Sequence, residues 1–112
     1  MRALVCPGQG SQKKSFLSPW LEIDGVREHL QRLSDAAGID LIHYGTEAEE
    51  ETIKDTAIAQ PLIVAAGIVT GRKVLQKLGE SKLILAGHSV GEITAAALAG
   101  VLTEEDAMRF VR

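Results

Sequence analysis

The chain has 112 residues, of which 46% are hydrophobic and 4% aromatic, so it holds one domain at most, with a core of aliphatic side chains. The formal net charge of -3, with no basic cluster larger than a pair, argues against nucleic-acid binding. The single cysteine, Cys6, excludes an internal disulfide and fits a reducing cytosol, where we expect it to be a buried small hydrophobe. The amino-terminal apolar stretch is too short for a secretory signal, and no run approaches membrane-spanning length. We therefore expect a cytoplasmic protein that binds no membrane.

The first element is an apolar run over residues 2–6 that predicts a buried strand ended by Pro7. Residues 7–12, PGQGSQ, follow as a polar loop rich in glycine. Open α/β sheets place their sites in loops that leave the carboxyl ends of strands. The glycines at 8 and 10 permit the backbone N–H of Gln9 to approach a ligand closely, although a plain turn remains the alternative. The spacing of a phosphate-binding loop is absent.

Residues 24–37 show apolar side chains at helical spacing. Asp24 is the expected N-cap of this helix, and Gly38 is its expected stop. His29 falls on the polar face, where we expect it to be exposed. Trp20, just before the helix, is predicted to anchor the core.

The acidic run over residues 46–52 begins with Thr46 and Glu49 spaced as a capping box. Its glutamates predict a solvated face rather than a metal site, because no second ligand cluster accompanies them. A longer helical pattern covers residues 59–78, with Pro61 in its first turn. Gly67 and Gly71 lie four residues apart on it, a spacing that allows close packing against a neighbouring element.

The most informative stretch is LILAGHSVGEITAAA at residues 83–97. A strand predicted over residues 82–86 leads into GHSVG, and an alanine-rich helix begins near Val90. Strand, tight turn and helix in this order form the context that a nucleophile elbow requires. Ser89 is therefore the candidate nucleophile; the alternative is that Ser89 only caps the helix and the glycines only make the turn.

A final helix is predicted after Thr103 as N-cap, with acidic residues 104–106 complementing its positive end. Arg109, on this helix, is expected to lie at the surface. The two predicted strands are separated by helices, as parallel α/β strands are, and two strands alone leave unpaired edges and uncovered faces. We expect α/β architecture in which residues 1–112 are the amino-terminal part of one larger domain.

Four motifs in order give the chain a resemblance to the malonyl-CoA:acyl carrier protein transacylase family. They are PGQGSQ at residues 7–12, the pair Gln60 and Pro61 opening a long helix, GHSVGE at residues 87–92, and the Gly-Val pair at residues 100–101. The resemblance implies an α/β-hydrolase-like acyltransferase domain of parallel strands and flanking helices, incomplete at its carboxyl end.

The resemblance also implies the chemistry. Ser89 would take malonyl from coenzyme A and pass it to the phosphopantetheine thiol of acyl carrier protein in fatty-acid biosynthesis, with no metal or cofactor. The backbone N–H groups of Gln9 and Val90 would form the oxyanion hole, and Gln60 would lie near the substrate. The family's general base and its malonate-binding arginine would both lie downstream of residue 112. His88, His29 and His43 have no motif support as the base.

Two alternatives remain open at this point. The same domain occurs within polyketide and fatty-acid megasynthases, where the acceptor differs. A serine esterase or thioesterase of the α/β-hydrolase type would use water as the acceptor instead. The malonate-binding arginine separates the transferase from the hydrolase, because it pairs with the substrate carboxylate.

Overall fold

The computed structural model describes residues 2–6, 13–78, 83–87 and 90–111. Two strands, β1 (Arg2–Cys6) and β2 (Leu83–Gly87), form a parallel pair in which Arg2 is opposite Leu83 and Cys6 is opposite Gly87. The first strand has the predicted bounds. The second begins and ends one residue later than predicted. The predicted parallel α/β arrangement is therefore present in the described residues.

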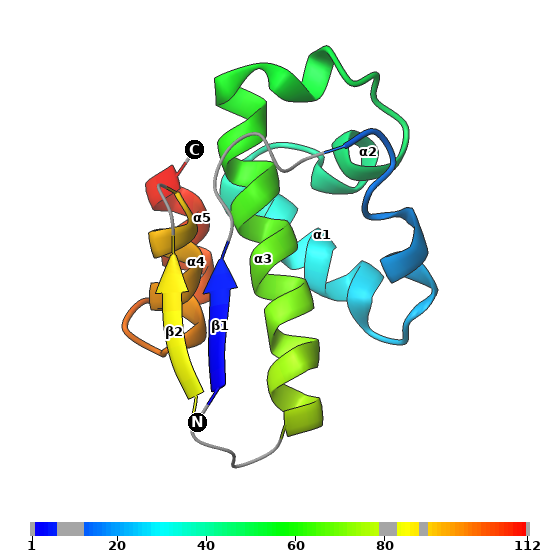
Figure 1. Cartoon of the computed structure of the whole chain (residues 1–112). Coiled ribbons are helices and arrows are strands. Elements are labelled where there is room, and N and C mark those ends of the chain that lie inside the picture. Colours follow the sequence, from blue (N-terminus) through cyan, green and yellow to red (C-terminus); the bar gives the residue numbers. More distant parts are fainter. Residues whose placement is uncertain (1, 7–12, 79–82, 88–89, 112) are drawn as a thin grey trace.

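Helices make up most of the remaining described chain, and Figure 1 shows them beside and behind the strand pair. The long helix α3 runs antiparallel to both strands, so its first turns lie at the end of the molecule where the strands end (Figure 1). Helix α4 contacts both strands, α3 and α5, while α5 also contacts α1. The helical elements are η1 (Ser18–Glu22), α1 (Val26–Ala37), α2 (Leu41–Thr46), η2 (Thr52–Lys54), α3 (Thr56–Leu78), α4 (Gly91–Leu98) and α5 (Glu104–Val111).

Helix α1 confirms the predicted stop but corrects the predicted cap. Gly38 ends the helix in the left-handed region, at φ 75°. The N-cap is Gly25, at φ 86°, rather than Asp24. Because the chain turns through a conformation that favours glycine, the helix begins only after it. The carbonyl of Asp24 accepts a bond from Lys73 Nζ at 3.3 Å instead.

The region around residue 46 also differs from the prediction. Thr46 ends the short helix α2, and its hydroxyl donates to the carbonyl of Ile42 at 2.7 Å, so it caps no following helix. Glu49 pairs with Lys14 Nζ at 3.1 Å, so the predicted capping box is wrong. The glutamates at 47, 49, 50 and 51 are exposed, as predicted.

Helix α3 starts three residues earlier than predicted. The Asp55 carboxylate accepts the amide of Ala57 at 2.9 Å, and its carbonyl accepts the amide of Ala59 at 2.7 Å, which starts the helix at Thr56. Pro61 is therefore inside the helix rather than in its first turn. It lacks the N–H that would bond to the carbonyl four residues earlier.

The core is built around α3, where the side chains of Leu62, Val64 and Ile68 are all 0% exposed. Trp20 is partly buried and packs against this core, so it anchors η1 as predicted. The stretch Thr56–Gln76 is long and apolar enough to cross a membrane by length and composition, contrary to the prediction that no run has this character. Central helices of domain cores meet the same criteria, and α3 contacts α1, α2, α4 and α5.

Candidate active site

The carboxyl ends of the two strands are neighbours. Cys6 and Gly87, the last residues of β1 and β2, are paired in the sheet register. Residues 7–12 and residues 88–89, which lie outside the described part of the chain, follow directly after these two strand ends in the sequence. This is the edge where parallel α/β sheets place their sites.

Helix α4 begins immediately beyond the second strand. Only His88 and Ser89 separate the end of β2 from Val90, which is the N-cap of α4. Val90 has φ -62° and ψ -15°, and its carbonyl accepts the amide of Ile93 at 3.0 Å. Its side chain is buried, with 9% exposed. The predicted strand and the helix that follows it two residues later are confirmed, whereas the predicted tight turn itself lies outside the described residues. The amide groups of the first helical turn are those without an intrahelical acceptor.

Of the four predicted site residues, two lie outside the described residues and two lie within them. Ser89 and Gln9 lie outside the described residues, as do His88 and the side chain of Cys6. Val90 is placed at the start of α4, as stated above. Gln60 is partly buried and belongs to the early turns of α3. Figure 1 shows these turns at the end of the molecule where both strands end.

Helix α4 is seated on α3 through two glycines, as their spacing predicted. A Cβ atom at Gly67 would lie 2.6 Å from Thr94 Cγ2, and one at Gly71 would lie 2.5 Å from Leu98 Cδ1. The two helices therefore approach so closely that a Cβ at either position would displace a side chain of α4. The Thr94 hydroxyl, in a side chain only 1% exposed, has no hydrogen-bond partner among the described residues.

A cluster of charges lies at the opposite end of α4. The Glu104 carboxylate contacts Arg72 Nε at 2.7 Å, His29 Nε2 at 2.6 Å and Arg32 Nη2 at 2.7 Å. Its side chain is 11% exposed. Burial alone raises the pKa of this carboxyl, but the interactions with Arg72, His29 and Arg32 outweigh burial and hold the pKa below its ordinary value of 4.5.

The two histidines that the structure describes both contact glutamates. His29 is only 16% exposed because it contacts Glu104, so the prediction of an exposed residue is wrong. His43 Nδ1 lies 3.1 Å from Glu47 Oε2 on α2. Within residues 13–78 and 90–111, no group of three metal-ligating side chains occurs. Arg109 is 59% exposed and pairs with Asp106 at 3.0 Å, which confirms its predicted surface role.

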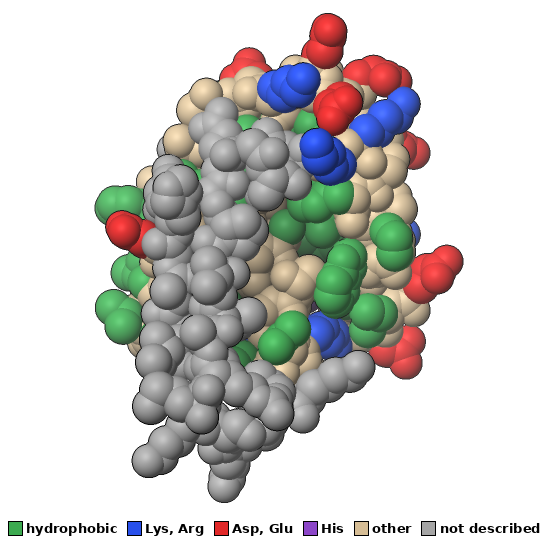
Figure 2. Space-filling view, in the orientation of Figure 1, with side chains coloured by type: hydrophobic (Ala, Val, Ile, Leu, Met, Phe, Trp, Pro, Cys, Tyr) green, Lys and Arg blue, Asp and Glu red, His purple; other side chains and the backbone are tan. Residues whose placement is uncertain are grey.

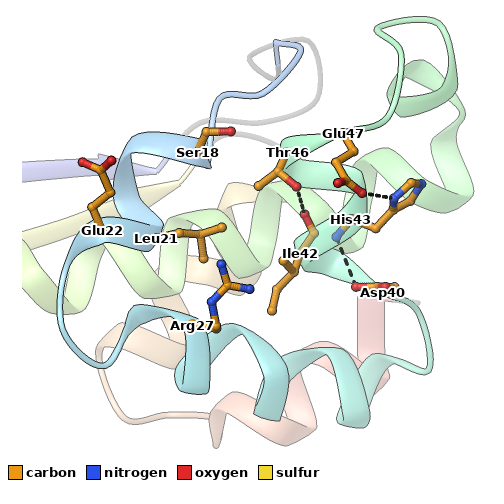
Figure 3. Close-up of a pocket in the computed structure, with 9 residues that line it drawn as sticks. All are labelled: Ser18, Leu21, Glu22, Arg27, Asp40, Ile42, His43, Thr46 and Glu47. Atoms are coloured by element: carbon orange, nitrogen blue, oxygen red, sulfur yellow. Dashed lines mark hydrogen bonds and ion pairs between the residues drawn. The ribbon is translucent and has the colours of Figure 1, made fainter.

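One described pocket is formed without the strands or α4. It has a volume of about 620 Å³ and opens between η1, α1 and α2 (Figure 3). Asp40 Oδ1 accepts a hydrogen bond from the amide of His43 at 3.1 Å, so the carboxylate of Asp40 in this pocket serves to cap α2. Its lining comprises Ser18, Leu21, Glu22, Arg27, Asp40, Ile42, His43, Thr46 and Glu47. Because neither strand nor α4 contributes a residue to this lining, we do not assign it as the active site.

A second, more apolar pocket of about 280 Å³ lies along α3. Figure 2 shows hydrophobic side chains gathered on this face of the molecule. The pocket is lined by Phe16, Leu17, Trp20, Ile63, Ala66, Gly67 and Thr70. The described part of this lining offers no nucleophile with an adjacent base, so it carries no chemistry of its own.

Comparison with known proteins identifies the family. The family model described as acyl transferase domain matches residues 3–112. The malonyl CoA-acyl carrier protein transacylase of Mycobacterium tuberculosis (strain ATCC 25618 / H37Rv) is 48% identical over 110 residues, covering 96% of this chain and 36% of that protein. The chain thus spans about a third of the length of the curated relatives it matches.

Solved structures of transacylases are also similar to this chain over about a third of their own length. The crystal structure of the enzyme from Mycobacterium tuberculosis superimposes with a TM-score of 0.94 at 47% identity, over 99% of this chain and 37% of that one. A malonyl-transacylase solved in complex with a type II polyketide acyl-carrier protein gives a TM-score of 0.87 at 35% identity, over 98% of this chain and 36% of that one.

Proposed function

We propose, on the premise that the chain belongs to the acyl transferase domain family, that residues 1–112 form the amino-terminal part of a single acyltransferase domain. The full-length protein that carries this segment is called the parent protein below. Its activity is the transfer of malonyl from coenzyme A to the phosphopantetheine thiol of acyl carrier protein in fatty-acid synthesis. The sheet is proposed to be part of a larger α/β-hydrolase-like sheet, and the cytoplasm is the predicted location.

One observation carries this proposal beyond the family match. Strand β2 ends at Gly87, α4 starts at Gly91, and the end of β2 is paired with the end of β1 at Cys6. A serine in the two-residue interval between Gly87 and Val90 satisfies the sequence context of a nucleophile elbow. The loop that carries Gln9 starts from the neighbouring strand end. We infer that the backbone N–H groups of Gln9 and Val90, from separate parts of the chain, meet at this edge.

The first half-reaction is nucleophilic acyl transfer. Ser89 Oγ attacks the thioester carbonyl of malonyl-CoA and loses its proton to a base, which is a histidine beyond residue 112 according to the family resemblance. The backbone N–H groups of Gln9 and Val90 donate to the oxyanion of the tetrahedral intermediate. When the intermediate collapses, the carbon–sulfur bond breaks, and the coenzyme A thiolate leaves and takes up the proton.

The second half-reaction reverses the roles. The thiol of the carrier protein's phosphopantetheine loses its proton to the base and attacks the malonyl-serine ester. The ester carbon–oxygen bond breaks, and the proton returns to Ser89 Oγ. A malonyl thioester on the carrier protein and free serine result. Gln60, at the same end of the molecule, is proposed to contact the bound substrate.

A polyketide carrier protein is the second candidate acceptor. The observation that favours it is the relative whose structure contains a type II polyketide acyl-carrier protein. The chemistry at Ser89 is the same with either acceptor, so only the surface that meets the carrier would differ.

The test is the release of coenzyme A by the purified parent protein. With malonyl-CoA alone, a transacylase releases coenzyme A up to one equivalent of enzyme and then stops. Addition of phosphopantetheinylated carrier protein restores continuous release. Continuous release without any carrier would instead indicate a hydrolase with water as acceptor. Parallel reactions with fatty-acid and polyketide carriers identify the preferred acceptor by its higher kcat/KM.

A further inference from the structure

The carboxyl end of α4 is held by one arginine from α3. Arg72 Nη2 donates to the carbonyl of Ala97 at 3.0 Å, and Nη1 donates to the carbonyl of Leu98 at 3.3 Å. The third nitrogen, Nε, donates to Glu104 Oε2 at 2.7 Å. A single guanidinium therefore joins α3, the last turn of α4 and the first turn of α5. Lysine, with one compact ammonium group, cannot reproduce this fork.

This contact is more than a cap. Helix α4 already ends with its own backbone bonds, since the amide of Gly100 donates to the carbonyl of Ala97 at 3.2 Å and the amide of Val101 to that of Ala96 at 2.9 Å. Gly100, at φ 82°, provides the left-handed turn that such endings use. The guanidinium adds a cation at the negative end of the helix dipole. Its particular contribution is to attach this end of α4 to other helices.

Glu104, to which Arg72 attaches the end of α4, is itself held by further contacts. Glu104 also contacts His29 Nε2 at 2.6 Å and Arg32 Nη2 at 2.7 Å, and both of these residues belong to α1. The Glu104 side chain is 11% exposed, so charged hydrogen bonds to it are stronger than those at an open surface. Arg72 thus links the end of α4 to α1, α3 and α5 together.

The opposite end of α4 is the end that matters for the reaction. Helix α4 has eight residues and is about 12 Å long at 1.5 Å per residue. Val90, its N-cap, directly follows Ser89 in the chain. A short helix moves as one body, so a displaced carboxyl end also displaces the amino end. Misplacement of reacting groups by about 1 Å can reduce a rate by about a hundredfold.

We propose that Arg72 is a positioning residue, which sets the orientation of α4 and thereby the location of Ser89 and the Val90 N–H. This inference rests on the proposed transacylase function. Arg72 contacts no substrate and acts only through the backbone of α4. A residue that merely stabilises the fold would instead affect activity in proportion to the loss of folded protein.

Arg32 provides a matched control. Its Nη2 lies 2.7 Å from Oε1 of the same carboxylate, Glu104. Among the described residues, it donates no hydrogen bond to α4. The parent protein is prepared as Arg72→Met, Arg72→Lys and Arg32→Met variants. The rate of malonyl adduct formation is followed by quenched-flow mass spectrometry at saturating malonyl-CoA. Thermal unfolding reports the stability of each variant.

The expected result is a loss of about tenfold or more in the adduct rate for Arg72→Met, with KM changed by less than about twofold. Arg32→Met retains the wild-type rate within about twofold, even if its melting temperature falls as much as that of Arg72→Met. Arg72→Lys keeps the charge but not the fork, so it stays well below wild type. Equal rate losses in Arg72→Met and Arg32→Met would overturn the inference.

A second measurement does not depend on activity. Backbone amide exchange over residues 90–98 is expected to accelerate in Arg72→Met and to remain unchanged in Arg32→Met. Unchanged exchange in both variants would overturn the positioning role, whatever the activity. Absence of an adduct on the wild-type protein would instead overturn the proposed function. The two failures are therefore distinguishable.

Discussion

Substitution of Gly67 by alanine tests the close packing of α4 against α3. The new Cβ would lie 2.6 Å from Thr94 Cγ2 and 3.1 Å from Thr94 Oγ1. Ordinary carbon contacts are about 3.5–4.0 Å, so the helices would have to separate by about 1 Å. Thr94 is 1% exposed and β-branched, and it therefore has little freedom to rotate away.

The size of the effect follows from two opposing contributions. Overpacking of a well-packed contact costs about 1–3 kcal/mol. Alanine in a helix gains about 1 kcal/mol over glycine, which offsets part of this cost. We expect Gly67→Ala to lower the free energy of unfolding by up to about 2 kcal/mol. For a domain of 150–250 residues, each kcal/mol corresponds to about 2–4 °C in melting temperature.

The assay is urea and thermal unfolding of the parent protein with two further variants. Gly71→Ala is the control, because its Cβ would meet Leu98 Cδ1 at 2.5 Å, the flexible end of a side chain that can rotate at smaller cost. Thr94→Ala removes Cγ2 and Oγ1 and leaves only its Cβ, at 3.4 Å from the Gly67 position. The double variant should therefore be more stable than the sum of single effects by about 0.5–3 kcal/mol. Strict additivity, or a more stable Gly67→Ala protein, would refute the reasoning.

Three further predictions concern individual groups and the isolated segment. Thr94→Val replaces a buried hydroxyl that lacks a partner among the described residues with a methyl group, and should raise the urea midpoint by the equivalent of about 1 kcal/mol; a lower midpoint would contradict it. Glu104→Gln should cost roughly 1–3 kcal/mol at pH 7. Because the folded-state pKa of Glu104 is lowered from 4.5, the carboxylate's contribution is present above that value and is lost as pH falls through the folded-state pKa, so the gap between wild type and Glu104→Gln should shrink in acid. A gap that is constant between pH 7 and pH 3 would contradict this. The isolated 112-residue chain should show poor folding by circular dichroism and no appreciable turnover. Ready turnover by this chain would contradict that prediction.

Local patterns predicted much of the region around the elbow. The apolar run before GHSVG and the alanine-rich run after it predicted the strand and the helix, because both signals lie within a few residues of each other. Thr103 was predicted as an N-cap, and its hydroxyl accepts the amide of Asp106 at 3.0 Å. The spacing of Gly67 and Gly71 predicted close packing, although not that α4 is the partner.

Short elements depend on contacts that no local pattern contains. Helix α2 has only six residues and was not predicted, although Asp40 before Leu41 is a sufficient capping signal in retrospect. The backbone of this helix is held by Leu17, whose amide donates to the carbonyl of Gly45 at 3.1 Å. Tertiary contact therefore decided whether this segment became helical.

The charge cluster around Glu104 shows the same limit for functional residues. Its partners His29 and Arg72 lie 75 and 32 residues away in the sequence. Each of these residues reads as part of a solvated helix face when its own helix is considered alone. Only packing of α1, α3 and α5 brings these side chains to one carboxylate.

The most direct test of the account is the intact mass of the parent protein after brief incubation with malonyl-CoA, beside a Ser89→Ala variant. The account predicts one malonyl adduct on the wild-type protein, located on Ser89 by peptide mapping and removed by acyl carrier protein. It predicts no adduct on Ser89→Ala. An adduct on both proteins, or consumption of malonyl-CoA without an adduct on either, would contradict a malonyl-serine intermediate at this elbow.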